Sequence, residues 1–197
     1  LLRHDKFNAH TVSSMAPDRN TYLRRPDFGR VLSPASADYL RNTVSTQRIG
    51  TGIGIGIGII DGLSAYAIQN HAIPVLQLLR AQLDADWEHL PVLVATQGRV
   101  ALGDEIGEAL NLELIIVLIG ERPGLSSPDS LGAYITYAPI SGLHDAQRNC
   151  VSNIRPQGLG YAAAAHKIQW LCEHALRAKL TGVELKDDSG VKIVADR

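Results

Sequence analysis

Cysteine is scarce in this sequence: Cys150 and Cys172 are the only two among 197 residues. Two cysteines form no disulfide framework, and they fit a reducing cytoplasm. No segment reaches the roughly 18 consecutive apolar residues that a membrane-spanning helix needs. The first ten residues are polar and mixed in charge, unlike a signal peptide. We therefore expect a cytoplasmic protein without a membrane segment.

Charge of one sign is not concentrated anywhere in the chain. The formal net charge is −1, and no block of lysine and arginine stands out. This pattern argues against a nucleic-acid-binding surface and against a polybasic membrane patch. The 45% of hydrophobic residues is enough for a real core, and the length suits one domain with a short arm or appendage.

Nucleotide-binding motifs are also missing. Gly52 and Gly54 begin a G-x-G pattern, but Ile57 stands where the dinucleotide fingerprint needs its third glycine. These glycines also lie inside a predicted strand, whereas the fingerprint follows one. No G-x-x-x-x-G-K-[ST] phosphate loop occurs in the sequence.

The sequence shows no self-contained catalytic or metal-binding set. The seven histidines are scattered, and neither H-E-x-x-H nor C-x-x-C is present. Ser64 does not meet the G-x-S-x-G nucleophile elbow, because Tyr66 replaces the last glycine, and a helix N-cap is the better interpretation of this serine. Cys150 has no histidine neighbour in sequence, and a small, half-buried structural cysteine is its default interpretation.

What the sequence does contain is an alternation of apolar strand and helix patterns, which predicts an α/β domain. Strands are predicted over residues 50–60, 90–95, 112–119 and 132–137, with 149–154 as a further strand or an extended loop. Helices are predicted over residues 34–43, 64–83 with a break at Pro74, 103–110 and 161–179. Connections of ten or more residues imply right-handed crossovers and a mostly parallel sheet flanked by helices.

In the first predicted strand, glycine and isoleucine alternate with a period of two. All glycines then fall on one face of the strand and the isoleucines on the other. A bare face lets another backbone, a helix or a ligand approach closely.

Loops at the carboxyl ends of the predicted strands are the expected ligand site. They are Asp61–Ser64, Gln97–Val100, Glu121–Gly124 and, after the fourth strand, Ala138-Pro139. Gly120 directly follows the apolar run 112–119, and the adjacent opposite charges of Glu121 and Arg122 come between this glycine and Pro123. A crevice at this edge of a parallel sheet is where α/β proteins usually bind ligands.

We divide the chain into three parts on this basis. Residues 1–48 form an N-terminal arm and a short helix, and residues 1–33 show little periodicity. Residues 49–182 form the α/β domain, and residues 183–197 form a marginally ordered tail with a short apolar stretch, Val191 to Val194.

A set of short motifs in this order resembles the small (light) subunit of ethanolamine ammonia-lyase from about residue 20 to about residue 183. The motifs are Tyr22–Arg30, Asp61–Ser64, Gly98–Val100, Gly103–Glu108, Gly120–Leu125 and Cys150–Ile154. Each motif is weak alone, but the ordered set is specific.

The resemblance implies a subunit of a hetero-oligomeric lyase that converts ethanolamine to acetaldehyde and ammonia by radical chemistry. The enzyme uses adenosylcobalamin, whose Co–C bond breaks homolytically, and the cofactor lies between the large catalytic subunit and a Rossmann-like small subunit. The resemblance further implies that the small subunit binds cofactor without supplying catalytic residues, and it adds a bacterial microcompartment to the cytoplasm as a location.

The resemblance assigns three cobalamin contacts: Val100, Glu121 and Cys150. Arg99 adjoins the first and is a secondary contact. No D-x-H-x-x-G motif occurs and no histidine lies in the four loops, which fits base-on binding, in which the cofactor's own base stays on cobalt.

Two alternatives remain open at this point. One is an independent small α/β enzyme that depends on a nucleotide, against which the missing fingerprint and elbow count. The other is a purely structural interaction domain, in which the four loops would be dispensable.

Overall fold

The computed structural model describes residues 7–44, 54–121 and 129–190. Within these residues, six strands form one sheet in the order β1-β3-β2-β4-β5-β6. The strands are β1 (Asn8–Ser13), β2 (Ile55–Ile60), β3 (Pro91–Thr96), β4 (Leu114–Glu121), β5 (Ser130–Tyr137) and β6 (Asn149–Ile154). The α-helices are α1 (Arg19–Arg24), α2 (Pro34–Tyr39), α3 (Ala65–Gln82), α4 (Leu102–Ala109) and α5 (Tyr161–Ala178). Shorter helical turns are η1 (Phe28–Arg30), η2 (Leu40–Val44) and η4 (Asp145–Gln147). The predicted mixed α/β class is confirmed.

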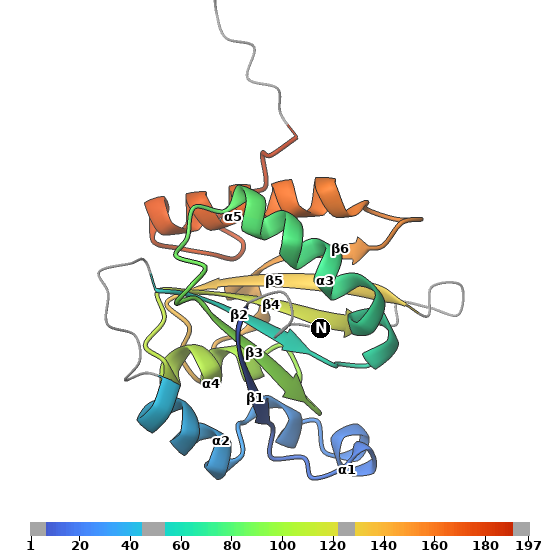
Figure 1. Cartoon of the computed structure of the whole chain (residues 1–197), viewed down its shortest axis with the longest axis vertical. Coiled ribbons are helices and arrows are strands. Elements are labelled where there is room, and N and C mark those ends of the chain that lie inside the picture. The colour runs from blue at the N-terminus through green and yellow to red at the C-terminus, as the bar shows by residue number, and fades with distance from the viewer. Residues whose placement is uncertain (1–6, 45–53, 122–128, 191–197) are drawn as a thin grey trace, which may run out of the picture.

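Helices cover the sheet from both sides, with α3 and α5 on one face and α4 with the N-terminal helices on the other (Figure 1). Strand β4 shows why, because its side chains are buried on both faces. Leu114, Ile116 and Leu118 enter the core beneath α3 and α5. Ile115, Val117 and Ile119 enter a second core beneath α4. A strand that is apolar on both sides needs such a three-layer arrangement.

The glycines of β2 face the α4 side, and close packing explains one of them. A Cβ added at Gly56 would lie 2.5 Å from Cδ1 of Leu112. At Gly58 the nearest atom would be 3.7 Å away, which is ordinary van der Waals contact. Ile55, Ile57 and Ile59 point to the opposite core, as the alternation predicts.

The direction of β5 differs from the sequence prediction. Strands β1, β3, β2 and β4 pair in parallel, but β5 runs antiparallel to β4 and β6 antiparallel to β5. Residues 122–129 are too few for the crossover that a parallel neighbour requires. Ala138-Pro139 therefore lies at the opposite edge of the sheet from the other three loops, and its predicted place in the crevice is wrong.

The N-terminal segment contains more regular structure than predicted. Strand β1 pairs in parallel with β3, from Asn8 opposite Pro91 to Ser13 opposite Thr96. Only Val12 is buried in this edge strand, so the sequence carries no hydrophobic alternation there. Helix α1 follows, with the Asp18 side chain accepting a hydrogen bond from the Thr21 backbone N–H. The division of the chain at residues 48 and 182 stays a prediction.

Two predicted helix N-caps, Ser33 and Ser64, are confirmed. Ser33 caps α2 ahead of Pro34, and Ser64 accepts a hydrogen bond from the Ala67 N–H at the start of α3. The predicted break at Pro74 is wrong, since α3 runs from Ala65 to Gln82. Buried residues on both sides of the proline hold the helix against the sheet, and this packing offsets the missing backbone hydrogen bond.

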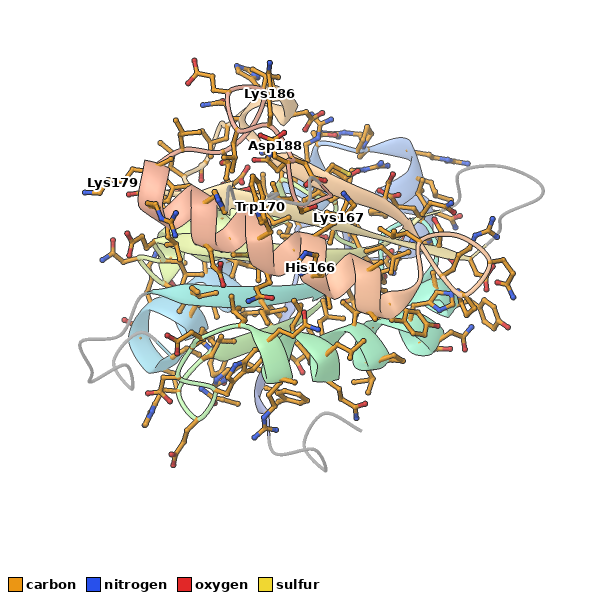
Figure 2. All side chains as sticks on the ribbon, turned by 90° about the horizontal axis from the view of Figure 1, so that it is seen from above. His166, Lys167, Trp170, Lys179, Lys186 and Asp188 are labelled. Atoms are coloured by element: carbon orange, nitrogen blue, oxygen red, sulfur yellow. The ribbon has the colours of Figure 1, made fainter. Side chains whose placement is uncertain are left out.

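The segment after α5 returns along that helix. The Lys167 ammonium donates to Asp187 at 2.6 Å and to the Ser189 hydroxyl at 3.1 Å. Figure 2 shows Lys167 on α5 with Lys186 and Asp188 of the returning segment above it. The tail is thus tied to the domain as far as this contact, while the apolar stretch from Val191 to Val194 lies outside the described residues.

Candidate functional site at the carboxyl edge of the sheet

A pocket of about 550 Å³ lies at the carboxyl ends of β2, β3 and β4. Its walls come from five separate parts of the chain. They include Tyr22 and Arg30 from the N-terminal segment, Gly62 and Leu63 after β2, Arg99 and Val100 after β3, Ile119 to Glu121 of β4, and Ser141 to Asp145 before β6. Three of the four predicted loops therefore contribute, and the other two parts are the N-terminal segment and a loop before β6 that the sequence did not indicate.

Of the four residues predicted to contact cobalamin, three line the pocket and one lies outside it. Val100, Arg99 and Glu121 line the pocket together. Cys150 is not among the lining residues but lies on β6 opposite Tyr134 of β5. The Tyr134 hydroxyl donates a hydrogen bond of 2.8 Å to Oε1 of Glu121. Cys150 is thus connected to the pocket through the side chains of Tyr134 and Glu121.

Glu121 is the last residue of β4, where the sequence had predicted the first residue of a loop. It pairs with Ser130 of β5, so its backbone is fixed by the sheet. The neighbouring Arg122, Pro123 and Gly124 of the predicted loop lie outside the described residues.

Hydrogen bonds to backbone groups join the ends of β2, β3 and β4 beside the pocket. Both carboxylate oxygens of Asp61 accept hydrogen bonds, from the Gln97 N–H at 2.9 Å and the Gly98 N–H at 3.1 Å. The Gly120 carbonyl accepts from the Leu63 N–H at 2.9 Å. A Cβ at Gly120 would lie 2.0 Å from the Ser64 carbonyl oxygen, so only glycine permits this approach. The three strand ends are therefore locked to one another.

Arg99 is held by the N-terminal segment. Its guanidinium carbon lies 4.6 Å from the centroid of the Tyr22 ring, and Nη2 donates to the Tyr22 carbonyl at 3.3 Å. Arg19 lies at the same distance from this ring and donates to the carbonyls of Gly62 and Leu63. Burial raises the pKa of the Tyr22 hydroxyl, against the effect of the two cations. The segment predicted as an arm therefore builds one wall of the pocket.

The groups around Glu121 remain neutral hydrogen-bonding partners. Burial, followed by the hydrogen bond to Glu121, raises the pKa of the Tyr134 hydroxyl far above neutrality, so it stays a donor. Cys150 is exposed as a residue, yet desolvation of its thiol raises the thiol pKa, with Tyr134 acting in the opposite direction. The thiol offers a small uncharged contact and not a thiolate nucleophile.

The loop before β6 is anchored by a buried ion pair that sequence reasoning missed. Arg148 contacts the Asp104 carboxylate of α4, and both side chains are almost completely buried. The same guanidinium donates to the Leu143 carbonyl at 3.0 Å and reaches Asp145 at 3.1 Å. Burial raises the pKa of Asp104 to about 6, although Arg148 opposes this shift. No local signal links two residues 44 positions apart.

This anchored loop places His144 at the pocket, where the sequence had predicted no histidine. In the ranges that the structure covers, no group of three or more histidine, cysteine, aspartate or glutamate side chains could hold a metal ion. Across the same ranges, no helix is long and apolar enough to cross a membrane.

Comparison with known proteins identifies the family. The profile of the family "Ethanolamine ammonia-lyase light chain (EutC)" matches residues 1–186. The chain belongs to the ethanolamine ammonia-lyase light-chain family. The match begins earlier than the residue of about 20 at which the motif resemblance starts, so the N-terminal segment with β1 and α1 is part of the family's sequence.

Curated members of the light-chain family are similar over most of this chain. The ethanolamine ammonia-lyase small subunit of Azotobacter vinelandii is 51% identical over 191 residues, which are 96% of this chain and 70% of that protein. Those of Pseudomonas fluorescens and Xanthomonas campestris are each 52% identical, over 92% and 90% of this chain and 66% and 65% of their own lengths. The chain thus spans about two thirds of the length of these relatives.

Proposed function

We propose that this chain is the small subunit of an adenosylcobalamin-dependent ethanolamine ammonia-lyase and helps to bind the cobalamin where it meets the large catalytic subunit. The observation that carries the proposal is the convergence of Val100, Arg99 and Glu121, from the ends of β3 and β4, on one pocket. The names of the curated relatives support the enzyme and the subunit. They do not favour an independent nucleotide-dependent enzyme.

The residues around the pocket fit a corrinoid. A volume of about 550 Å³ suits one side of so large a cofactor and leaves the rest for a partner subunit. The ring edge carries amides, which need both acceptors and donors. Glu121 supplies a carboxylate, while Arg99 and Arg30 supply guanidinium groups. The buried Nε of Arg99 has no hydrogen-bond partner among the described residues.

Each contact has a distinct role in this proposal. Glu121 accepts amide N–H groups of the cofactor, and Arg99 donates to amide oxygens or to the nucleotide phosphate. Val100 and Cys150 supply small uncharged surface. Adenosylcobalamin supplies the radical chemistry when bound, and this chain holds and orients it without a catalytic residue of its own.

Three further statements belong to the same proposal. The fold is Rossmann-like, which the parallel strands β3, β2 and β4 with helices on both faces support. Cobalamin binds base-on, which the absence of a D-x-H-x-x-G motif supports. The hetero-oligomer works in the cytoplasm or in a bacterial microcompartment.

The deciding experiment is ethanolamine deamination with adenosylcobalamin, using the large subunit with and without this chain. Activity that requires both proteins supports the proposal. If the chain co-purifies with the large subunit but adds neither activity nor cobalamin binding, the proposal is wrong.

A further inference from the structure

The side chain of Glu121 is held in place by two residues of the neighbouring strand β5, Gly132 and Tyr134. Gly132, Tyr134 and Glu121 share one face of the sheet, because Ile119 pairs with Gly132 and Val117 with Tyr134. This is the face that α4 covers further along, through Ile119 and Val117.

Gly132 provides the space for the carboxylate. A Cβ added there would lie 2.7 Å from both Cδ and Oε1 of Glu121. Because real Cβ atoms do not come this close, alanine would force the carboxylate, the flexible end of its side chain, to move. The Glu121 side chain therefore lies back along β5, directly over the glycine.

Tyr134 provides the hydrogen bond. Its hydroxyl reaches Oε1 of Glu121 at 2.8 Å, from a ring that is partly buried against the α4-side core. A charge-assisted bond of this kind is stronger than a neutral one. Among the described residues, the hydrogen bond to this carboxylate goes to Oε1, on the side of Tyr134. Glu121 lines the pocket, whereas Tyr134 does not.

We infer that Tyr134 and Gly132 are positioning residues that fix the Glu121 carboxylate so that its second oxygen, Oε2, accepts from an N–H donor on the edge of the bound ring. This inference rests on the proposed cobalamin-binding function. Tyr134 does not line the pocket and acts on the ligand through Glu121, and Gly132 acts by leaving room for the carboxylate.

The test uses the complex of this chain with the large subunit and measures the Kd for cyanocobalamin by its visible absorption. Tyr134→Phe removes the hydroxyl, and Gly132→Ala displaces the carboxylate without removing any polar group. Each is expected to raise the Kd about tenfold, the loss typical of a hydrogen bond to a charged group. Tyr137→Phe makes the same chemical change at the far end of β5 and should leave the Kd unchanged.

A double-mutant cycle separates positioning from a general structural effect. If Tyr134 acts through Glu121, adding Tyr134→Phe to Glu121→Gln should change the Kd little beyond the effect of Glu121→Gln alone. With adenosylcobalamin, Tyr134→Phe should raise the KM for cofactor and leave kcat at saturation near wild type. A variant that merely lowered the amount of folded complex would reduce the apparent kcat instead.

The outcomes distinguish this inference from the function on which it rests. A wild-type complex that binds no cyanocobalamin overturns the proposed function and the inference with it. If Glu121→Gln raises the Kd for cyanocobalamin but Tyr134→Phe and Gly132→Ala bind like wild type, the positioning role is wrong and the proposed function stands. Should Tyr134→Phe fail to fold, Gly132→Ala decides the question by the same measurement.

Discussion

Arg148 and Asp104 form an ion pair in which the side chains are only 1% and 2% exposed. Through this contact and the Leu143 carbonyl, the guanidinium ties the pocket's last wall to helix α4. Taking one partner away leaves the other charge buried without compensation.

Arg148→Met should therefore lower the free energy of unfolding by about 3 kcal/mol, as breaking buried pairs does. Urea denaturation at pH 7 measures this. Arg41→Met is the matched control, because the Arg41–Asp38 pair is exposed and such pairs contribute about 1 kcal/mol or less. Equal effects of the two changes would contradict the role given to burial.

The raised pKa of Asp104 predicts a pH dependence of stability. The folded-state pKa is about 6 against an ordinary value of 3.8, so the folded protein binds more protons than the unfolded chain between these values. The free energy of unfolding from this group must then fall as pH rises from about 4 to about 6. Asp104→Asn cannot titrate, and relative to it the wild type should lose stability over this range. A flat difference between the two proteins in urea denaturation at pH 4 and pH 6.5 would refute the prediction.

Gly120→Ala should destabilise the domain, because the new Cβ would meet the backbone carbonyl of Ser64, which cannot rotate away. Overpacking of this kind costs about 1–3 kcal/mol. Gly58→Ala is the control on the adjacent strand β2, since its Cβ would make only ordinary contacts. Thermal unfolding of both variants measures the difference, and a Gly120→Ala protein as stable as Gly58→Ala would count against the locked strand ends.

Apolar side chains beside the pocket predict where the large subunit docks. Tyr66, at the start of α3, is 62% exposed, and the neighbouring Leu63 is 41% exposed. Tyr66→Asp should weaken co-purification with the large subunit about tenfold or more, as loss of an aromatic interface anchor does. Its own fold should not change. Val183→Asp, at a position 76% exposed on the segment after α5, should co-purify like wild type. Undiminished assembly of Tyr66→Asp would place the interface elsewhere.

If cobalamin binds base-on, as proposed, the axial nitrogen on cobalt comes from the cofactor. His144 is the imidazole among the described residues that line the pocket. Electron paramagnetic resonance of the cob(II)alamin complex should show the same axial nitrogen coupling in wild type and His144→Ala. Loss of that coupling in the variant, or its replacement by coupling from labelled histidine, would show that the protein supplies the ligand.

Local signals in the sequence were sufficient for most elements of the fold. Ser33 and Ser64 mark helix starts through short-range caps, and the apolar run that forms β4 is a continuous signal. Strand β1 carried no such signal, because a single buried residue leaves no period to detect. The predicted break at Pro74 was wrong because tertiary packing of α3, which a local pattern does not contain, outweighs the helix-breaking effect of proline.

The site was predictable only where it follows strand ends. Arg99, Val100 and Glu121 could be placed together because the carboxyl ends of parallel strands meet at one edge. Two other features depend on the direction of β5 and on the path of the loop before β6. They are the Arg148–Asp104 pair and the contacts of Glu121 with Gly132 and Tyr134. Neither is encoded in a short window of sequence.

The antiparallel turn from β5 to β6 has a consequence for how this surface can vary. On β6, Val151 and Ile154 enter the core beneath α3 and α5, while Cys150 and Ser152 are exposed on the other side. Substitutions at Cys150 can therefore change the surface next to Tyr134 while the buried residues of β6 keep their place in the core.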